Sequence, residues 1–415
     1  MAEPETCTTE TESLADTEAT DTDTTEAESH ATDTDASGAE TGSDTTDTDS
    51  SVPELTREEM LRLLEPDPEL TDEEKALRAL HIVCCRELTE HDPKSNADVC
   101  TRFSSFNKPS STSTKSVTEA IHGPRLQELT SSQQSSAVQS SVNVISLKVA
   151  DSDVGYPISV FGTVLARDDA DYRCVYLFRR DRDDPQFIDS PEDMLTLTGP
   201  NRGLVVPDTI FFEFNLKIKG DGTTGDRDFS KGVIEHYPVP LEKGPKAELL
   251  SSWLSTVELV LAPVPFAVAA TVKVRILNGP CDAPFSGKIT AWTAGDTESH
   301  IILYDEQEHR AMGGHRLTGD GGSIALSRDL VAVHVPSSLY DDEYEEIAVS
   351  VCFTSRDGDG ECTCVTLQYP QEEKVCVHGA YELQVEVTWT AILEGPFGTD
   401  VDKRWSSVPL KPLLF

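Results

Sequence analysis

Basic residues are scarce in this sequence. The first fifty residues contain no lysine or arginine, and the whole chain holds 34 basic residues against 74 acidic ones. Sixteen of the acids lie in that first segment, and removing them from the net charge of −40 leaves −24 for the remaining residues. Such a surface repels DNA, RNA and anionic membranes. No cluster of basic residues with interleaved aromatics offsets this charge, so we expect no nucleic-acid partner.

Long apolar runs are also missing. The longest, residues 257–274, is interrupted by Glu258, Pro263, Pro265 and Lys273, which makes it too broken to span a bilayer. The N-terminus has no basic region followed by an apolar one, the pattern of a secretory signal. We therefore expect a cytoplasmic or nuclear protein that is not secreted. In that reducing compartment most of the ten cysteines should be free thiols.

Catalytic motifs are absent as well. The sequence has no G-x-S-x-G elbow, no P-loop and no H-E-x-x-H. The stretch GDGTTG, residues 220–225, matches a dinucleotide loop in its letters, but no helix follows to hold a pyrophosphate, so a hairpin turn is expected. His300, His309 and His315 flank a glycine-rich surface loop without a shared spacing. We predict no catalytic residue and no organic cofactor.

What the sequence does contain is a long repeat. Residues 144–168 align without a gap on residues 269–293, 125 positions later. In both segments the apolar residues fall at every second position, which is the period of a β-strand. A repeat of this length indicates duplicated domains.

Short alternating segments continue through both copies, separated by Gly, Pro and Asp turns. This pattern predicts an all-β body of two tandem antiparallel seven-stranded β-sandwiches, C2-like or Ig-like. One large sandwich built from both copies is the alternative. The expected strands are residues 144–149, 158–167, 175–178, 203–206, 210–219, 233–239 and 256–261, then 270–277, 285–293, 300–304, 324–335, 346–354, 362–369 and 381–392.

The remaining segments have distinct compositions. Acidic residues, Thr and Ser fill the N-terminus, which predicts a disordered tail. Two short helices at 55–64 and 71–88 are expected next, the second with a capping-box spacing at Thr71 and Glu74. The predicted organisation is a tail over 1–53, helices over 54–92, a Ser/Thr/Gln-rich linker over 93–141, sandwiches over 142–262 and 263–395, and a C-terminal tail over 396–415.

Three stretches resemble a known family. They are VFG-x-V-x-ARD at residues 160–168, LTGP-x-R at 197–202 and YELQVEVTWTAIL at 381–393. They are similar to a plant domain of unknown function, abundant in grasses, that is sometimes fused to a ribosome-inactivating N-glycosidase. The resemblance covers residues 142–393 and implies a fold and a lineage. The toxin's E-A-x-R signature is missing, because Glu119-Ala120-Ile121-His122 lacks the arginine, so we expect no N-glycosidase activity.

Acidic loops are the first candidate metal site. Asp168, Asp169 and Asp171 end one expected strand, and Asp181, Asp183 and Asp184 follow the next. C2-like sandwiches bind calcium with such loop carboxylates, since hard cations prefer oxygen ligands. Arginines are mixed among these acids, so salt-bridged surface loops are the alternative.

Cysteines of the second copy are the other candidate. Placing a turn apex at Asp357 sets Cys352 opposite Cys362, and both point with Cys364 to the face without the apolar stripe. Cys376 and His378 share one face of the next segment. These five side chains suggest a zinc site, while the opposed pair suggests a Cys352–Cys362 disulfide. Simple packing of small thiols is the third interpretation.

Two functions remain open at this point. The first is a non-enzymatic binding module with a protein partner and a stress- or defence-related role, since sheets and loops offer partner surfaces. The second is a sandwich-fold hydrolase that acts on a sugar or small molecule through paired loop carboxylates. A deep cleft with two inward carboxylates would favour the enzyme.

Overall fold

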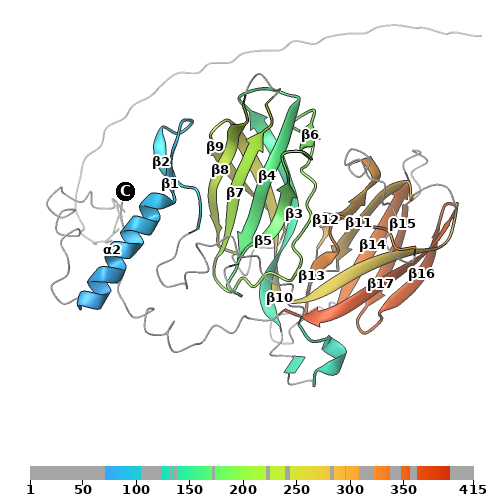
Figure 1. The fold of residues 1–415 in the computed structure, drawn as a ribbon. Helices are drawn as coiled ribbons and strands as arrows, with labels where there is room; N and C mark the ends of the chain where they lie inside the picture. Colours follow the sequence, from blue (N-terminus) through green and yellow to red (C-terminus); the bar gives the residue numbers. More distant parts are fainter. Residues whose placement is uncertain are drawn as a thin grey trace, which may run out of the picture. The chain divides into compact units, whose positions relative to one another are not determined.

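The computed structural model describes residues 71–103, 123–130, 133–134, 138–170, 173–220, 225–238, 244–280, 285–294, 296–307, 322–336, 347–355 and 362–392 (Figure 1). All of them belong to one unit of the chain, residues 63–415. Several predictions fall outside the described residues: both tails, the helix at 55–64, Asp171, the interior of GDGTTG, and two histidines, His309 and His315.

The described chain is built almost entirely of antiparallel strands, as predicted. Its elements are α2 (Asp72–Glu87), β1 (Thr89–Asp92), β2 (Ala97–Cys100), the 3-10 turn η2 (Leu126–Glu128), β3 (Gln139–Ser152), β4 (Ile158–Arg167), β5 (Val175–Arg180), β6 (Gln186–Ile188), β7 (Ile210–Ile218), β8 (Arg227–His236), β9 (Lys246–Ser252), β10 (Ser255–Asn278), β11 (Gly287–Thr293), β12 (Asp296–Asp305), β13 (Leu330–His334), β14 (Ala348–Ser355), β15 (Cys362–Gln368), β16 (Glu373–His378) and β17 (Tyr381–Ala391). No helix among these residues is long and apolar enough to cross a membrane.

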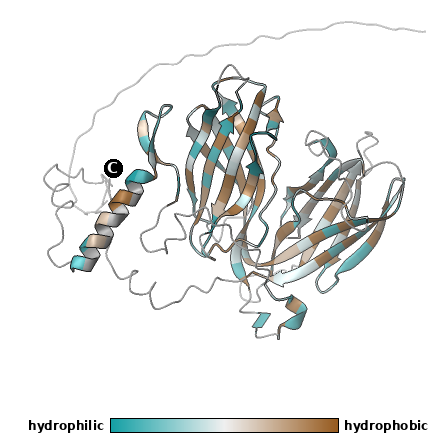
Figure 2. Cartoon of the chain, viewed as in Figure 1, coloured by the Kyte–Doolittle hydropathy of each residue, from teal (hydrophilic) through white to brown (hydrophobic). Residues whose placement is uncertain are grey.

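The first sandwich encloses one apolar core. One sheet has the order β5-β4-β7-β8, with β6 also paired to β4, and the other joins β3, the first half of β10 and β9. Along β7 the buried Phe212, Phe214 and Leu216 alternate with more polar residues (Figure 2). This alternation directs one face of the strand into the core.

The second sandwich repeats the arrangement. Its sheets have the orders β12-β11-β14-β15 and β13-β10-β17-β16. The core between them contains Phe285, Phe353 and Trp389, all nearly inaccessible to solvent. The order β12-β11-β14-β15 matches the order β5-β4-β7-β8 of the first copy, as the predicted duplication requires: β4 corresponds to β11, β7 to β14 and β8 to β15.

One strand belongs to both sandwiches. The first half of β10 pairs with β3 and β9, and the second half pairs with β13 and β17. The register with β3 shifts between Val264 and Ala267, where Phe266 has a positive φ of 49°. The predicted boundary between residues 262 and 263 therefore lies inside a strand. Neither a single merged sandwich nor two separate ones is present, because the last strand of one copy continues as the first strand of the next.

Polar side chains form hydrogen bonds between the two sandwiches that share β10. Asn143 accepts a hydrogen bond from the amide of Ala332 and donates one to its carbonyl oxygen, each at 2.8 Å. Arg328 donates to the carbonyl oxygens of Val144, Ile145 and Ile302. Buried backbone groups need such partners, so these two side chains tie β3 to the second copy.

Each sandwich has eight strands when β10 is counted twice, one more than the pattern predicted. The sequence did not predict three short strands, β6, β9 and β16. Their residues do not place apolar side chains at every second position on the face that points inward. The predicted strand at 203–206 is instead an irregular segment, although Val205 and Val206 are buried and Val206 donates a backbone hydrogen bond to Ser140 of β3.

The region before the first sandwich is more ordered than predicted. Helix α2 covers the second expected helix, but β1 and β2 form a hairpin across the predicted boundary at residue 92, and η2 lies in the predicted linker. The hairpin packs on the sandwich through buried Asp92, which accepts a hydrogen bond from the amide of Trp253 at 2.8 Å. Phe103 adds a ring contact with Phe211 at 4.1 Å. Residues 89–103 are thus part of the first sandwich.

Candidate functional site

Three cysteines gather on the outer face of the second sandwich. Cys352 lies on β14, and Cys362 and Cys364 lie on β15. Val351 and Phe353 alternate with Cys352 and point into the core, so the three thiols point away from it, as predicted. We refer to these three residues as the cysteine cluster.

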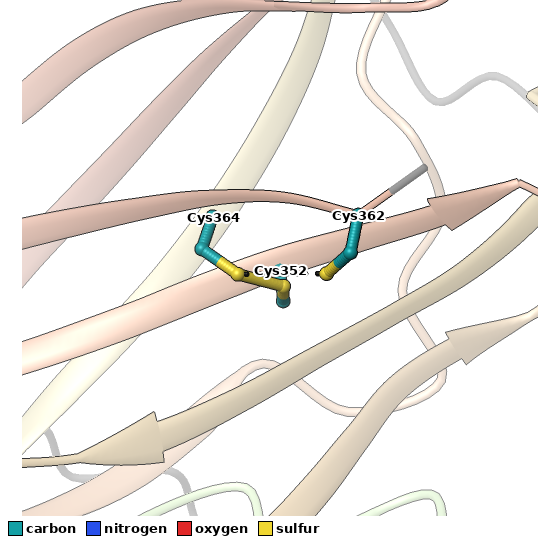
Figure 3. A group of neighbouring side chains, drawn as sticks. All are labelled: Cys352, Cys362 and Cys364. Carbon is teal, nitrogen blue, oxygen red and sulfur yellow. Dashed lines mark hydrogen bonds between the residues drawn. A yellow bond between two sulfur atoms is a disulfide. The ribbon is translucent and has the colours of Figure 1, made fainter. Parts of the chain in front are cut away.

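The register of β14 and β15 sets the geometry of this cluster. Cys352 pairs with Cys364, and Thr354 pairs with Cys362. The disulfide joins Cys352 to Cys364, with a Cα–Cα distance of 4.1 Å (Figure 3). The predicted Cys352–Cys362 disulfide is wrong, because the midpoint of the two strands falls at residue 358 and not 357.

A third sulfur remains beside the disulfide. The Sγ atom of Cys362 lies 3.5 Å from that of Cys364, and all three Sγ atoms lie within 4.8 Å of one another. Cys362 is exposed, while Cys352 is buried. The cluster therefore combines one oxidised pair with one accessible thiol.

Cys376 and His378 do not join the cluster. They lie on β16, in the opposite sheet of the sandwich. His378 is buried, with Nδ1 3.0 Å from Thr363 Oγ1 and its ring against Phe353. Cys376 packs against the core, and burial raises the pKa of its thiol although Lys374 opposes this. The five-residue zinc site predicted from the sequence is thus not assembled.

The cysteine cluster lines a cavity of about 440 Å³. Trp292 on β11 and His300 on β12 lie in the same wall, with ring centroids 4.8 Å apart. Met194 contributes an exposed side chain. The free thiol of Cys362 is therefore accessible to small molecules and ions from this cavity.

The acidic loops do not form the predicted calcium site. Asp168 is fully buried and accepts hydrogen bonds from both terminal nitrogens of Arg202, one at 2.7 Å, and from the amide of Val205. Asp184 pairs with Arg180, and Asp183 lies near Arg182. Among the described acids, including Asp169 and Asp181, no group of three carboxylates gathers. Arginines pair with Asp168, Asp183 and Asp184, as the salt-bridge alternative expected, but the Asp168–Arg202 pair is buried and does not lie on the surface.

A larger polar groove lies on the outer face of the first sandwich. Its volume is about 600 Å³. The charged residues that line it are Arg102, Arg167, Arg179, Arg180, Arg182 and Lys231, against Glu90, Asp181 and Glu213. We call it the arginine groove. Six cations and three carboxylates line it, and Asp184, Asp226 and Asp228, which do not line it, pair with Arg180, Arg182 and Lys231.

Structural pairing occupies several of these cations. Buried Arg167 forms a two-point pair with Glu213, and Lys231 pairs with Glu90. Arg179 differs, because no described carboxylate lies within ion-pair distance of it, and its guanidinium lies 5.0 Å from the ring centroid of Tyr176. An exposed arginine stacked on an aromatic ring presents its donors to solvent in a fixed orientation.

Sequence reasoning missed the arginine groove. Its residues come from segments as distant as Glu90, Arg102 and Lys231, and no short motif joins them. The only signal was the mixture of arginines with acids after β5, which was interpreted as surface salt bridges. Packing of the 89–103 hairpin on the sheet brings the distant cations together.

Two antiparallel β-sandwiches that share a strand define the architecture of this protein. The chain belongs to the family described as a domain of unknown function, DUF6598, whose model matches residues 141–387. No curated protein matches the sequence.

Two solved structures of human GIVD cytosolic phospholipase A2 show a distant likeness. The one in complex with methyl gamma-linolenyl fluorophosphonate has 9% identity and a TM-score of 0.18, and the alignment covers 60% of this chain and 32% of that one. The other has 10% identity and a TM-score of 0.17, covering 60% and 30%. The likeness spans about a third of the phospholipase chain and carries no argument about function.

Proposed function

We propose that the protein is a non-enzymatic binding module whose arginine groove takes an acidic segment of a partner protein. The observation that supports this most directly is Arg179, which is exposed, lies over the Tyr176 ring and has no described carboxylate within ion-pair distance. Arginine binds carboxylates through two parallel hydrogen bonds, which suits recognition of Asp and Glu side chains.

The short range of electrostatic forces in salt explains how the arginine groove can bind an acidic segment although the rest of the chain is acidic. At physiological salt the Debye length is about 8 Å, so a short acidic segment in the groove responds mainly to the arginines around it. A long polyanion also meets the acidic surface outside the groove and is repelled. This favours a short protein segment over a nucleic acid.

The alternative of a hydrolase has weaker support. A glycosidase needs one protonated carboxyl group beside one carboxylate. Glu213 and Asp168 are buried, and each is bound by an arginine at both oxygens. Their geometry suits structural ion pairs, and so the binding function is preferred.

The cellular setting is part of the proposal. We propose a cytoplasmic or nuclear location for this binding module. The resemblance to a domain abundant in grasses supports a plant protein with a stress- or defence-related role.

Binding of a fluorescent Glu/Asp-rich peptide to the full chain, followed by anisotropy, tests the proposal. Arg179→Glu should weaken binding by about tenfold, because it replaces the unpaired cation with a like charge. Lys374→Glu on exposed β16 makes the same charge change away from the groove and should leave affinity nearly unchanged. Equal losses in both variants, or no binding by the wild type, would refute the assignment.

A further inference from the structure

The cysteine cluster offers a second, independent site. We propose that, once the Cys352–Cys364 disulfide is reduced, Cys352, Cys362 and Cys364 bind one zinc ion as thiolates. This does not rest on the arginine groove, which lies on the other sandwich.

The sulfur positions fit this coordination. A zinc–thiolate bond of about 2.3 Å with tetrahedral angles separates two sulfurs by about 3.8 Å. The Sγ atoms of Cys362 and Cys364 are 3.5 Å apart, and all three sulfurs lie within 4.8 Å of one another. Small rotations of the side chains therefore suffice to surround an ion.

The backbone holds the three ligands on one rigid surface. Cys362 and Cys364 are two residues apart on β15 and thus share a face, and Cys352 faces Cys364 on the neighbouring strand. β14 and β15 are both held in a four-stranded sheet. Ligands on a sheet lose little conformational freedom on binding, which favours affinity.

The fourth coordination position is open to the cavity. His300 lines the same cavity, but β11 lies between its strand and β14, which separates it from Cys352 by about two strand spacings, roughly 10 Å. Water or a small ligand would complete the tetrahedron, as in zinc sites with three protein ligands.

Zinc binding and the disulfide exclude each other, because the disulfide consumes two of the three thiolates. A dithiol reductant transfers two electrons and two protons to the Cys352–Cys364 bond, forms its own cyclic disulfide and leaves two thiols. Zinc then displaces the protons of the three thiols. The site is therefore available in reducing conditions and closed by oxidation.

The test uses the full chain, reduced with a dithiol and desalted without oxygen. Zinc affinity is measured by competition with a chromogenic chelator, and cobalt replaces zinc to report thiolate ligation through its charge-transfer absorption. Cys362→Ser keeps the disulfide pair and removes one ligand. Cys100→Ser, an exposed cysteine on β2, is the matched control and also accounts for zinc bound by other thiols.

Wild type and Cys100→Ser should bind one more zinc than Cys362→Ser, or bind it at least about tenfold more tightly. Oxidation that restores the Cys352–Cys364 disulfide should release that ion. Equal zinc binding by wild type and Cys362→Ser would overturn the proposal, and so would retention of the ion by the oxidised protein.

Discussion

Gly162 and Gly287 occupy the same position in the two sandwiches, 125 residues apart. Both have positive φ angles, 118° and 148°. A Cβ atom would lie 2.2 Å from the carbonyl oxygen of Asn215 at Gly162, and 2.1 Å from that of Thr354 at Gly287. In both copies, therefore, the backbones of the two equivalent strands lie so close together that only glycine fits at this position.

Replacing either glycine should destabilise its own sandwich. Gly162→Ala and Gly287→Ala should each cost about 2–4 kcal/mol in free energy of unfolding, since a backbone clash adds to an unfavourable φ. Urea unfolding measures the loss. Gly225→Ala, which has open space around its Cβ position, is the control and should change little. A loss of unfolding free energy smaller than that of Gly225→Ala would show that the strands can move apart without cost.

Asp92 should anchor the 89–103 hairpin. Its carboxylate accepts hydrogen bonds from the amides of Trp253 and Lys94 and from the Ser95 hydroxyl. Asp92→Asn replaces an acceptor with a donor and should cost about 1–3 kcal/mol in docking of the hairpin. Faster hydrogen exchange at the Trp253 amide would report this. Asp98→Asn, on the exposed part of β2, should leave that exchange unchanged.

The same carboxylate predicts a pH dependence. Burial raises the pKa of Asp92, but the hydrogen bonds from Lys94, Ser95 and Trp253 outweigh it, and the pKa is lowered. The stability it contributes is therefore present above the unfolded pKa of about 3.9 and lost as pH falls through the lower folded value. In the wild type, the protection of the Trp253 amide from hydrogen exchange should fall as the pH falls. In Asp92→Asn, this protection should not depend on pH in the same range. Identical profiles would contradict it.

Arg328 should couple the two sandwiches. The residue is 5% exposed, and its guanidinium donates to three backbone carbonyls, two of them on β3. Arg328→Met leaves these carbonyls unpaired and should cost about 2–4 kcal/mol, with the two sandwiches unfolding at separate urea concentrations. Arg275→Met, at a more exposed arginine of β10, is the comparison. A single unchanged transition in Arg328→Met would show that the junction does not depend on this side chain.

Thiol reactivity should follow burial. Exposed Cys100 and Cys362 should react first with a small alkylating reagent at neutral pH. Cys174 is buried, and desolvation raises the pKa of its thiol despite nearby Arg167, so its thiolate is rare at that pH. Labelling by residue, read by mass spectrometry, should show Cys174 modified only on unfolding. Early modification of Cys174 would indicate an opening of the arginine groove.

The sequence predicted most of the strands and the repeat because side-chain alternation is a local signal that survives in residues 144–168 and 269–293. It missed β9, where Leu249 is exposed and the inner face is weakly apolar. It also placed Cys352 opposite Cys362, because strand register depends on turn geometry and a small change in the apex moves every pair. The arginine groove was not predictable, since four segments that are distant in the sequence build it only after folding.

The continuous strand β10 makes the two copies inseparable. Cutting the chain between the copies would leave the first sandwich without the strand that closes it, or the second without the strand that opens it. Either half would expose an unpaired edge next to an apolar core, a surface that recruits other chains. The two copies therefore form a single folding unit, and a shorter expression fragment should begin before β1 and end after β17.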